Sequence, residues 1–131
     1  MARRRKKKGG HYHTGVHSSP KAGECRYRSG WEFSYMIYLD NNKDVLTWSY
    51  EKTIIPYVSN VKTGKLRKYY PDFMIEHTDG TRQLVEIKPS RKLHHRTVAK
   101  KLVSAGDWCR ANGVTLVIVT EVELKTLGLL K

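Results

Sequence analysis

The stretch from Tyr69 to Lys88 constrains the fold of this chain more than any other part of its sequence. Two runs of β-forming residues flank Asp79-Gly80, and an Asp-Gly pair between such runs is typical of a tight hairpin. Side chains alternate along a strand, so Glu86 and Lys88 share one face of the second strand. The sequence therefore predicts a β-hairpin that displays a carboxylate beside an ammonium group.

The register of this hairpin decides whether Asp72 joins that face. A two-residue loop would set Asp72 opposite Ile87, on the wrong face, because one step of register exchanges the two faces. A loop that is longer or shorter by one residue, or a bulge, would set Asp72 opposite Glu86 or Lys88. A functional site at this point therefore requires an odd-length turn or a bulge.

Such a face has the groups needed to hydrolyse a phosphodiester. The carboxylates of Asp72 and Glu86 can hold Mg²⁺, a hard cation that prefers oxygen ligands. Lys88 beside them can orient the attacking water, help to deprotonate it, and offset phosphate charge. The alternative is an exposed cross-strand ion pair between Asp72 and Lys88, which would contribute about 0.2–1 kcal/mol and no chemistry.

Pro71-Asp72, followed after residues 73–85 by Glu86-Ile87-Lys88, resembles the core motif of the PD-(D/E)XK nuclease superfamily. Over residues 26–92 the chain is similar to the head completion nucleases of tailed bacteriophages. More distantly, it is similar to phage junction-resolving endonucleases and to the nuclease subunit of some transposases. The further blocks that carry this likeness occur in family order: Tyr27-Arg28-Ser29, Glu32, Trp48-Ser49 and Ile55-Pro56-Tyr57.

The resemblance implies a Mg²⁺-dependent DNA endonuclease, with Mn²⁺ as the other candidate metal. Asp72 and Glu86 would bind the metal together with the backbone carbonyl of Ile87, and Lys88 would lie beside the attacking water. Glu32, on the first helix, would reach the same metal site, although a capping role with Ser29 also explains it.

The resemblance also implies a biological setting, which is the processing or trimming of packaged phage DNA ends during head completion. The protein would then work in the cytoplasm of an infected bacterium or in association with the virion, with phage portal or head proteins as partners. Two alternatives stay open: a non-catalytic DNA-end-binding protein of the phage head or neck, and a junction-resolving endonuclease. The second would favour a dimer, but no sequence feature determines the oligomeric state.

The charge balance points to a nucleic-acid partner. The 131 residues include 25 Lys and Arg against 12 Asp and Glu, a net charge of +13. No apolar run approaches the ~20 residues of a membrane span. The basic residues predicted to contact double-stranded DNA are Arg28, Lys62, Lys65, Arg67, Lys68, Arg91, Lys92 and Arg96.

Residues 1–25 are expected to be a disordered basic tail, because a run of Lys and Arg leads into a stretch with little to bury. Four possible zinc ligands lie in this tail (His11, His13, His17 and Cys25), but their spacing matches no standard zinc finger.

Residues 26–131 are predicted to form a single nuclease domain of the α/β class, with an α+β mixed sheet and the restriction-endonuclease-like PD-(D/E)XK core. The expected element order is α-β-β-β-α-β-α. Its parts are a helix over 30–40, a strand or extended lead-in over 45–48, a strand over 52–58, a basic loop or hairpin tip over 61–68, the hairpin described above, a helix over 97–111, a buried strand over 114–119 and a short final helix.

Overall fold

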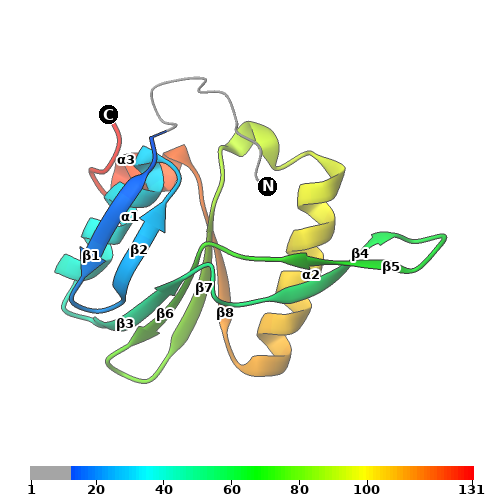
Figure 1. Ribbon diagram of the computed structural model, residues 1–131, viewed down its shortest axis with the longest axis horizontal. Coiled ribbons are helices and arrows are strands. Elements are labelled where there is room, and N and C mark those ends of the chain that lie inside the picture. The colour runs from blue at the N-terminus through cyan, green and yellow to red at the C-terminus, as the bar shows by residue number, and fades with distance from the viewer. Residues whose placement is uncertain (1–12) are drawn as a thin grey trace.

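The computed structural model describes residues 13–131, and its centre is a four-stranded mixed sheet in the order β3-β6-β7-β8 (Figure 1). β3, β6 and β7 run antiparallel, whereas β8 pairs with β7 in parallel. The mixed α+β architecture predicted from the sequence is thereby confirmed. The strands are β3 (Val45–Tyr50), β6 (Phe73–His77), β7 (Arg82–Ile87) and β8 (Thr115–Val119).

Helices cover both faces of this sheet, and each side has its own core. α1 (Gly30–Asn41) and α3 (Glu121–Thr126) pack on one face, where Tyr35, Met36 and Leu39 of α1 join a cluster around Phe73 and Ile75. α2 (Arg96–Asn112) packs on the other face through Ala105 and Cys109 against Leu84. Because helices cover both faces of the sheet, residues 84–87 of β7 are all buried, as expected for a strand that pairs in parallel.

The predicted place of one strand was wrong, and another strand was missed. The strand expected over 52–58 is β4 (Ile55–Asn60), and it does not belong to the sheet. It pairs with β5 (Lys65–Tyr69), so the segment 61–68, predicted as a basic loop or hairpin tip, holds the tip of this hairpin and most of its second strand, and β3 takes the place beside β6. The error has a simple cause, since a highly charged strand with one buried residue lacks the alternation that identifies strands.

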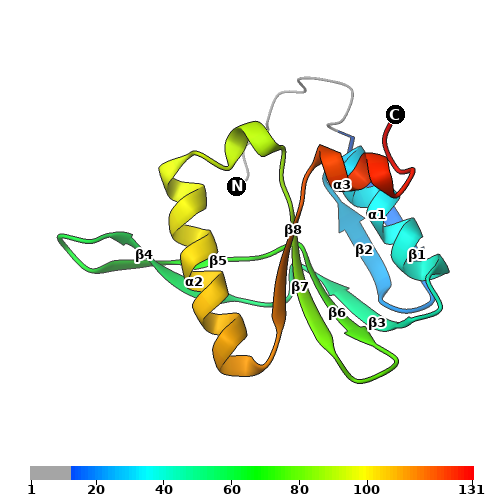
Figure 2. The ribbon, with the colours of Figure 1, turned by 180° about the vertical axis from the view of Figure 1, so that it is seen from behind.

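β4 and β5 together form a two-stranded arm, defined here as residues 55–69, that projects from the body beside α2 (Figures 1 and 2). At its base Ile55, Tyr57 and Tyr69 pack into the α2 core, whereas its far part is exposed. Gly64 closes the tip with φ of 72°, a conformation that L side chains rarely adopt.

The prediction of a disordered tail over residues 1–25 was wrong for its described part. β1 (Gly15–Ser19) and β2 (Gly23–Tyr27) form an antiparallel hairpin that packs against α1. Ser19 Oγ donates to Asp40 Oδ1 at 2.6 Å, and His17 Nε2 lies 2.7 Å from Asp40 Oδ2. The polar residues that suggested disorder therefore bind a carboxylate at the end of α1. The basic run before residue 13, together with His11, lies outside the described residues.

Local signals place the helix ends largely as predicted. The Ser29 hydroxyl accepts the Glu32 N–H at 3.1 Å and caps α1. Thr120 and Glu123 form the predicted capping box of α3. α2 begins at Arg96 rather than at a cap by Thr97, and its N-cap residue makes no capping bond. Within residues 13–131, no helix is long and apolar enough to cross a membrane.

Candidate active site

The register of the β6–β7 hairpin brings Asp72 and Glu86 to one point. Phe73 pairs with Val85, so one further step along the ladder sets Asp72 opposite Glu86. The turn explains this register, because the His77 N–H donates to the Thr81 carbonyl at 2.8 Å and leaves residues 78–80 as an odd-length loop. The structural requirement derived from the sequence is therefore met by the turn, without a bulge between the paired residues 73–76 and 82–85.

Asp72 lies just before β6 and is only 7% exposed. Its Oδ2 accepts the backbone N–H of Ile87 at 2.7 Å, which fixes the carboxylate against the end of β7. Burial, together with the nearby carboxylates of Glu86 and Glu32, raises the pKa of Asp72 well above its ordinary value, although the Ile87 N–H opposes the shift. An ionised Asp72 at this position is therefore costly unless a cation lies beside it.

Glu86 is 6% exposed and is held by neighbours on both sides. The Tyr69 hydroxyl donates to its Oε1 at 2.7 Å, and the Lys88 Nζ lies 3.5 Å from its Oε2. Burial raises the pKa of Glu86, while Lys88 and Tyr69 oppose that shift. The predicted pairing of a carboxylate and a lysine on one strand face is thus present, and a tyrosine from the arm orients the carboxylate.

Glu32 lines the same cleft from α1, and its carboxylate has two donors. Its Oε1 accepts the Tyr50 hydroxyl at 2.7 Å and the Arg28 backbone N–H at 2.8 Å. The capping box with Ser29 is therefore altered, because the side chain reaches one residue further back than the N-cap N–H. Glu32 has both a local structural role and a position at the candidate site.

Glu51 is a cleft residue that the sequence did not reveal. It follows β3 directly, has φ of 53°, and donates its backbone N–H to the Asp72 carbonyl at 2.9 Å. Its carboxylate pairs with the Arg28 guanidinium at 3.1 Å. Burial raises the pKa of Glu51, Arg28 lowers it and Glu32 raises it further. Its position after the Trp48-Ser49 block was the sole sequence signal, since a positive φ at a non-glycine residue cannot be seen in a sequence.

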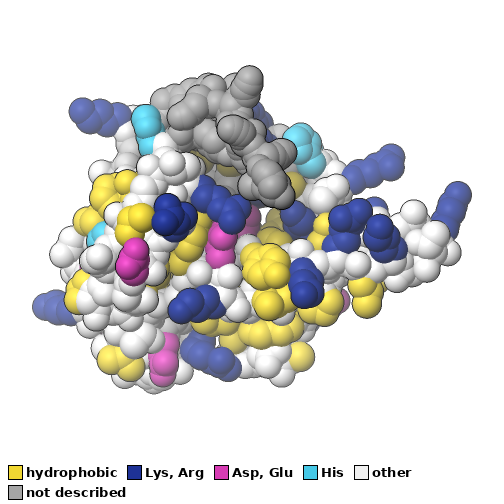
Figure 3. All heavy atoms as spheres, viewed as in Figure 1, with side chains coloured by type: hydrophobic (Ala, Val, Ile, Leu, Met, Phe, Trp, Pro, Cys, Tyr) yellow, Lys and Arg dark blue, Asp and Glu magenta, His cyan; other side chains and the backbone are white. Residues whose placement is uncertain are grey.

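These groups surround a cleft of about 500 Å³. Its acidic lining consists of Glu32, Glu51, Asp72 and Glu86. Basic side chains surround that lining: Arg28, Lys68, Lys88 and Lys101. Figure 3 shows the same pattern on the surface, with Asp and Glu in a hollow and Lys and Arg around it. An acidic floor with a basic rim suits a cation bound beneath an anionic substrate.

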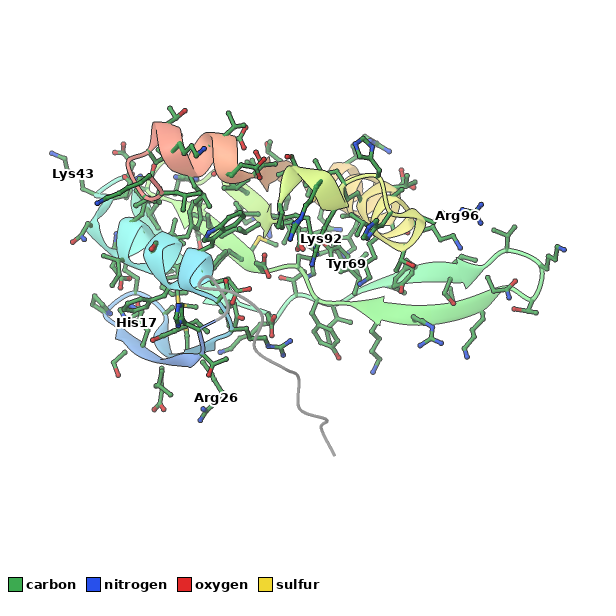
Figure 4. All side chains as sticks on the ribbon, turned by 90° about the horizontal axis from the view of Figure 1, so that it is seen from above. His17, Arg26, Lys43, Tyr69, Lys92 and Arg96 are labelled. Atoms are coloured by element: carbon green, nitrogen blue, oxygen red, sulfur yellow. The ribbon has the colours of Figure 1, made fainter. Side chains whose placement is uncertain are left out.

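The structure brings together only some of the predicted DNA-binding residues. Arg28 and Lys68 lie at the cleft, whereas Lys65 and Arg67 line a second groove. Arg91 borders a separate hollow beside Trp31. Lys92 lies in the short 3₁₀ helix (Ser90–Lys92) after β7, outside both the cleft and the second groove, and Figure 4 shows Arg96, the first residue of α2, towards the arm. Lys62 lies in the turn at the tip of the arm.

The donor set at the cleft fits a hard divalent cation. Asp72 and Glu86 offer carboxylate oxygens, and the backbone of Ile87, which also lines the cleft, offers a carbonyl. Within residues 13–131, no group of three or more His, Cys, Asp or Glu side chains is gathered closely enough to hold a metal. The fit therefore rests on two carboxylates and a backbone oxygen, an arrangement compatible with Mg²⁺, which retains several waters.

Comparison with known proteins shows the family of this chain. The family described as "TnsA-like endonuclease N terminal" matches residues 42–121, which include β3, the arm, the β6–β7 hairpin, α2 and β8. The chain is also 32% identical over 124 aligned residues to the "Head completion nuclease" of Enterobacteria phage T4. This alignment covers 78% of this chain and 82% of that protein. With its mixed sheet and its Asp72, Glu86 and Lys88 cluster, the chain belongs to the TnsA-like endonucleases, a family of the PD-(D/E)XK type.

Proposed function

We propose that this protein is a metal-dependent endonuclease that hydrolyses DNA phosphodiester bonds and processes phage DNA ends during head completion. The observation that carries the proposal is the meeting of Asp72, Glu86 and Lys88 in one basic-rimmed cleft. An isolated ion pair would need neither two buried carboxylates nor a cleft around them. Membership of an endonuclease family supports the same chemistry.

Asp72, Glu86 and the Ile87 carbonyl would hold Mg²⁺ or Mn²⁺, with Glu32 close enough to the cleft to tune it. When bound, the metal would polarise the scissile phosphate and offset the charge that develops on it. Glu86 is already oriented for this role, because Tyr69 holds one of its oxygens and Lys88 lies beside the other.

Lys88 is the group best placed to act on the attacking water. Its ammonium is partly exposed, lies 3.5 Å from the Glu86 carboxylate, and lines the cleft. It can orient the water by hydrogen bonding and offset charge on the phosphate. Arg28, Lys68 and Lys101 at the rim would bind neighbouring phosphates and set the position of the strand.

The biological role is proposed from the named relative. That protein is a head completion nuclease of a phage, and most of its length corresponds to this chain. We infer a similar role here, in the cytoplasm of an infected bacterium or on the virion, with portal or head proteins as partners. The junction-resolving endonuclease is the alternative with the same chemistry, and a DNA-end-binding protein without catalysis is the alternative with none.

The purified protein should be tested on linear duplex, branched and single-stranded DNA, each with Mg²⁺, with Mn²⁺ and with EDTA. Metal-dependent cutting that favours linear duplex DNA is the expected result. Preferential cutting of branched DNA would support the junction-resolving alternative instead. Salt-sensitive binding of every substrate without any cutting would refute the nuclease and favour the DNA-end-binding protein.

A further inference from the structure

A second basic groove lies beside the catalytic cleft, between the arm and α2. Lys68 of β5 and Lys101 of α2 line the cleft, and the preceding residue of each element, Arg67 and Lys100, lines the second groove. That groove has a volume of about 550 Å³ and also includes Lys65. The two hollows are therefore lined by neighbouring residues of the same two elements, and basic side chains continue from one to the other.

The charge of this groove is uncompensated. Between Glu51 and Asp72 the sequence contains no acidic residue. Within residues 13–131, the side chains of Lys65, Arg67 and Lys68 take part in no ion pair. A second copy of the chain would bring like charges together at this surface, so the groove suits a polyanion better than self-association.

The groove is also built to keep its shape. Lys100 Nζ donates to the Ser59 carbonyl at 2.8 Å, and Lys101 lies over the rings of Tyr57 and Tyr69, which ties the arm to α2. The neutral lining residues Thr97, Ser59 and Asn60 carry hydroxyl and amide groups of the kind that contact phosphate oxygens. The combination of fixed walls, free cations and neutral donors is typical of a backbone-binding surface.

The spacing matches a duplex that leads away from the cut. Lys65 and Lys68 lie on one strand, where their backbone positions are about 10 Å apart at about 3.3 Å per residue, and their side chains leave opposite faces of that strand, Lys65 towards the groove and Lys68 towards the cleft. Duplex DNA advances about 3.4 Å per base pair, so this separation corresponds to about three base pairs. Phosphates on one side of the scissile bond would thus meet the groove while the scissile phosphate lies in the cleft.

We propose that the groove between α2 and the arm binds the phosphate backbone of duplex DNA on one side of the cut, about three base pairs from it. The position of the cut rests on the nuclease function proposed above. Binding in the groove, however, needs neither metal nor cleavage. The protein therefore requires flanking duplex on the arm side more than on the other side.

The first test measures binding in EDTA, where cleavage cannot interfere. A duplex of about 30 base pairs is titrated with the wild type and with the Lys65→Ala/Arg67→Ala double variant at several salt concentrations, and each lost phosphate contact lowers the slope of log K against log salt by about 0.9. The double variant should therefore lose about 1.8 from the slope. Lys43→Ala is the matched control, because Lys43 is exposed and lies at the opposite end of the molecule from Arg96 (Figure 4).

A slope for the double variant equal to that of Lys43→Ala would overturn the proposal.

A second test varies the length of duplex on either side of the cut. The wild type should lose cleavage when one flank, and not the other, falls below about three base pairs, and the double variant should lose this asymmetry. A wild type that cuts equally well with either flank shortened would also overturn it. If the wild type cuts no DNA, the nuclease proposal fails, while the difference in salt slope still decides the groove.

Discussion

Asp72 accepts the backbone N–H of Ile87 at 2.7 Å, so the carboxylate before one strand is fixed by the residue that follows Glu86 on the next. This contact continues the β6–β7 ladder by a side chain at the point where the backbone ladder ends. The contact keeps the buried carboxylates of Asp72 and Glu86 close to each other. Two negative charges in a buried place destabilise a fold unless a cation compensates them. The arrangement favours cation binding over metal-free stability.

Asp72→Asn should make the metal-free protein more stable. The amide oxygen of asparagine can still accept the Ile87 N–H. The substitution removes the negative charge of a carboxyl group whose pKa is raised by burial and by Glu86 and Glu32. We expect a gain of ~1 kcal/mol, or about 3 °C in Tm, measured in EDTA. Mg²⁺ should raise the Tm of the wild type and not that of the variant. A variant that melts below the wild type in EDTA would contradict the account of repulsion between these carboxylates.

Tyr69→Phe should weaken metal use without removing a ligand. The Tyr69 hydroxyl donates to Glu86 Oε1, and loss of such a supporting bond commonly costs about 10–100-fold in metal affinity. The Mg²⁺ concentration for half-maximal cleavage should rise by that factor, with the maximal rate restored at high Mg²⁺. Tyr70→Phe is the control, since Tyr70 also lines the cleft but has no such bond among the described residues. Equal metal requirements in the two variants would exclude this role for Tyr69.

Glu121→Gln should reduce the acid sensitivity of folding. The Ser90 hydroxyl and N–H both donate to Glu121, and these bonds lower its pKa from 4.5 to about 2. Because the pKa of Glu121 is lower in the folded than in the unfolded state, its carboxylate stabilises the fold at any pH above the unfolded-state value. This contribution is lost as the pH falls from 4.5 towards 2. The Tm difference between wild type and variant should therefore be largest near neutral pH and shrink across that window. A difference independent of pH would show that the carboxylate charge is not what holds Ser90.

Asp40→Ala should release the N-terminal hairpin from α1. Its carboxylate accepts from Ser19 and from Trp48 Nε1, and it lies 2.7 Å from His17 Nε2. Leaving these groups unpaired should cost on the order of 3 kcal/mol in the free energy of unfolding, measured by urea denaturation. Asp44→Ala is the control, because Asp44 is exposed and its side chain forms no hydrogen bond or ion pair with the described residues. A loss of unfolding free energy as small as that of Asp44→Ala would mean that the hairpin contributes little to the stability of the domain.

Sequence reasoning succeeded where the determinants are local. The register of Asp72 against Glu86 depends on a turn a few residues away, so a functional site at these motif positions was enough to require an odd-length turn or a bulge, although the Asp79-Gly80 pair by itself suggested a two-residue loop. The caps of α1 and α3 are also local, and Ser29 and Thr120 were identified correctly.

It failed where the determinant is distant in sequence or hidden in the backbone. The β1–β2 hairpin is ordered by Asp40, a partner that no local pattern near His17 reveals. β5 is a strand because it pairs with β4 and buries Tyr69, although its neighbours are charged and exposed. Glu51 enters the cleft through a positive φ that composition cannot predict.

The central claim is that Asp72, Glu86 and Lys88 form a metal-dependent nuclease site. The most direct measurement compares cleavage of linear duplex DNA in Mg²⁺ by the wild type, Asp72→Asn and Lys88→Ala, with DNA binding measured in parallel. We predict that the wild type cuts only without EDTA, that Lys88→Ala is slower by about 10²–10⁴-fold, and that Asp72→Asn does not cut, while all three bind DNA. Cutting by both variants at the wild-type rate would contradict the account.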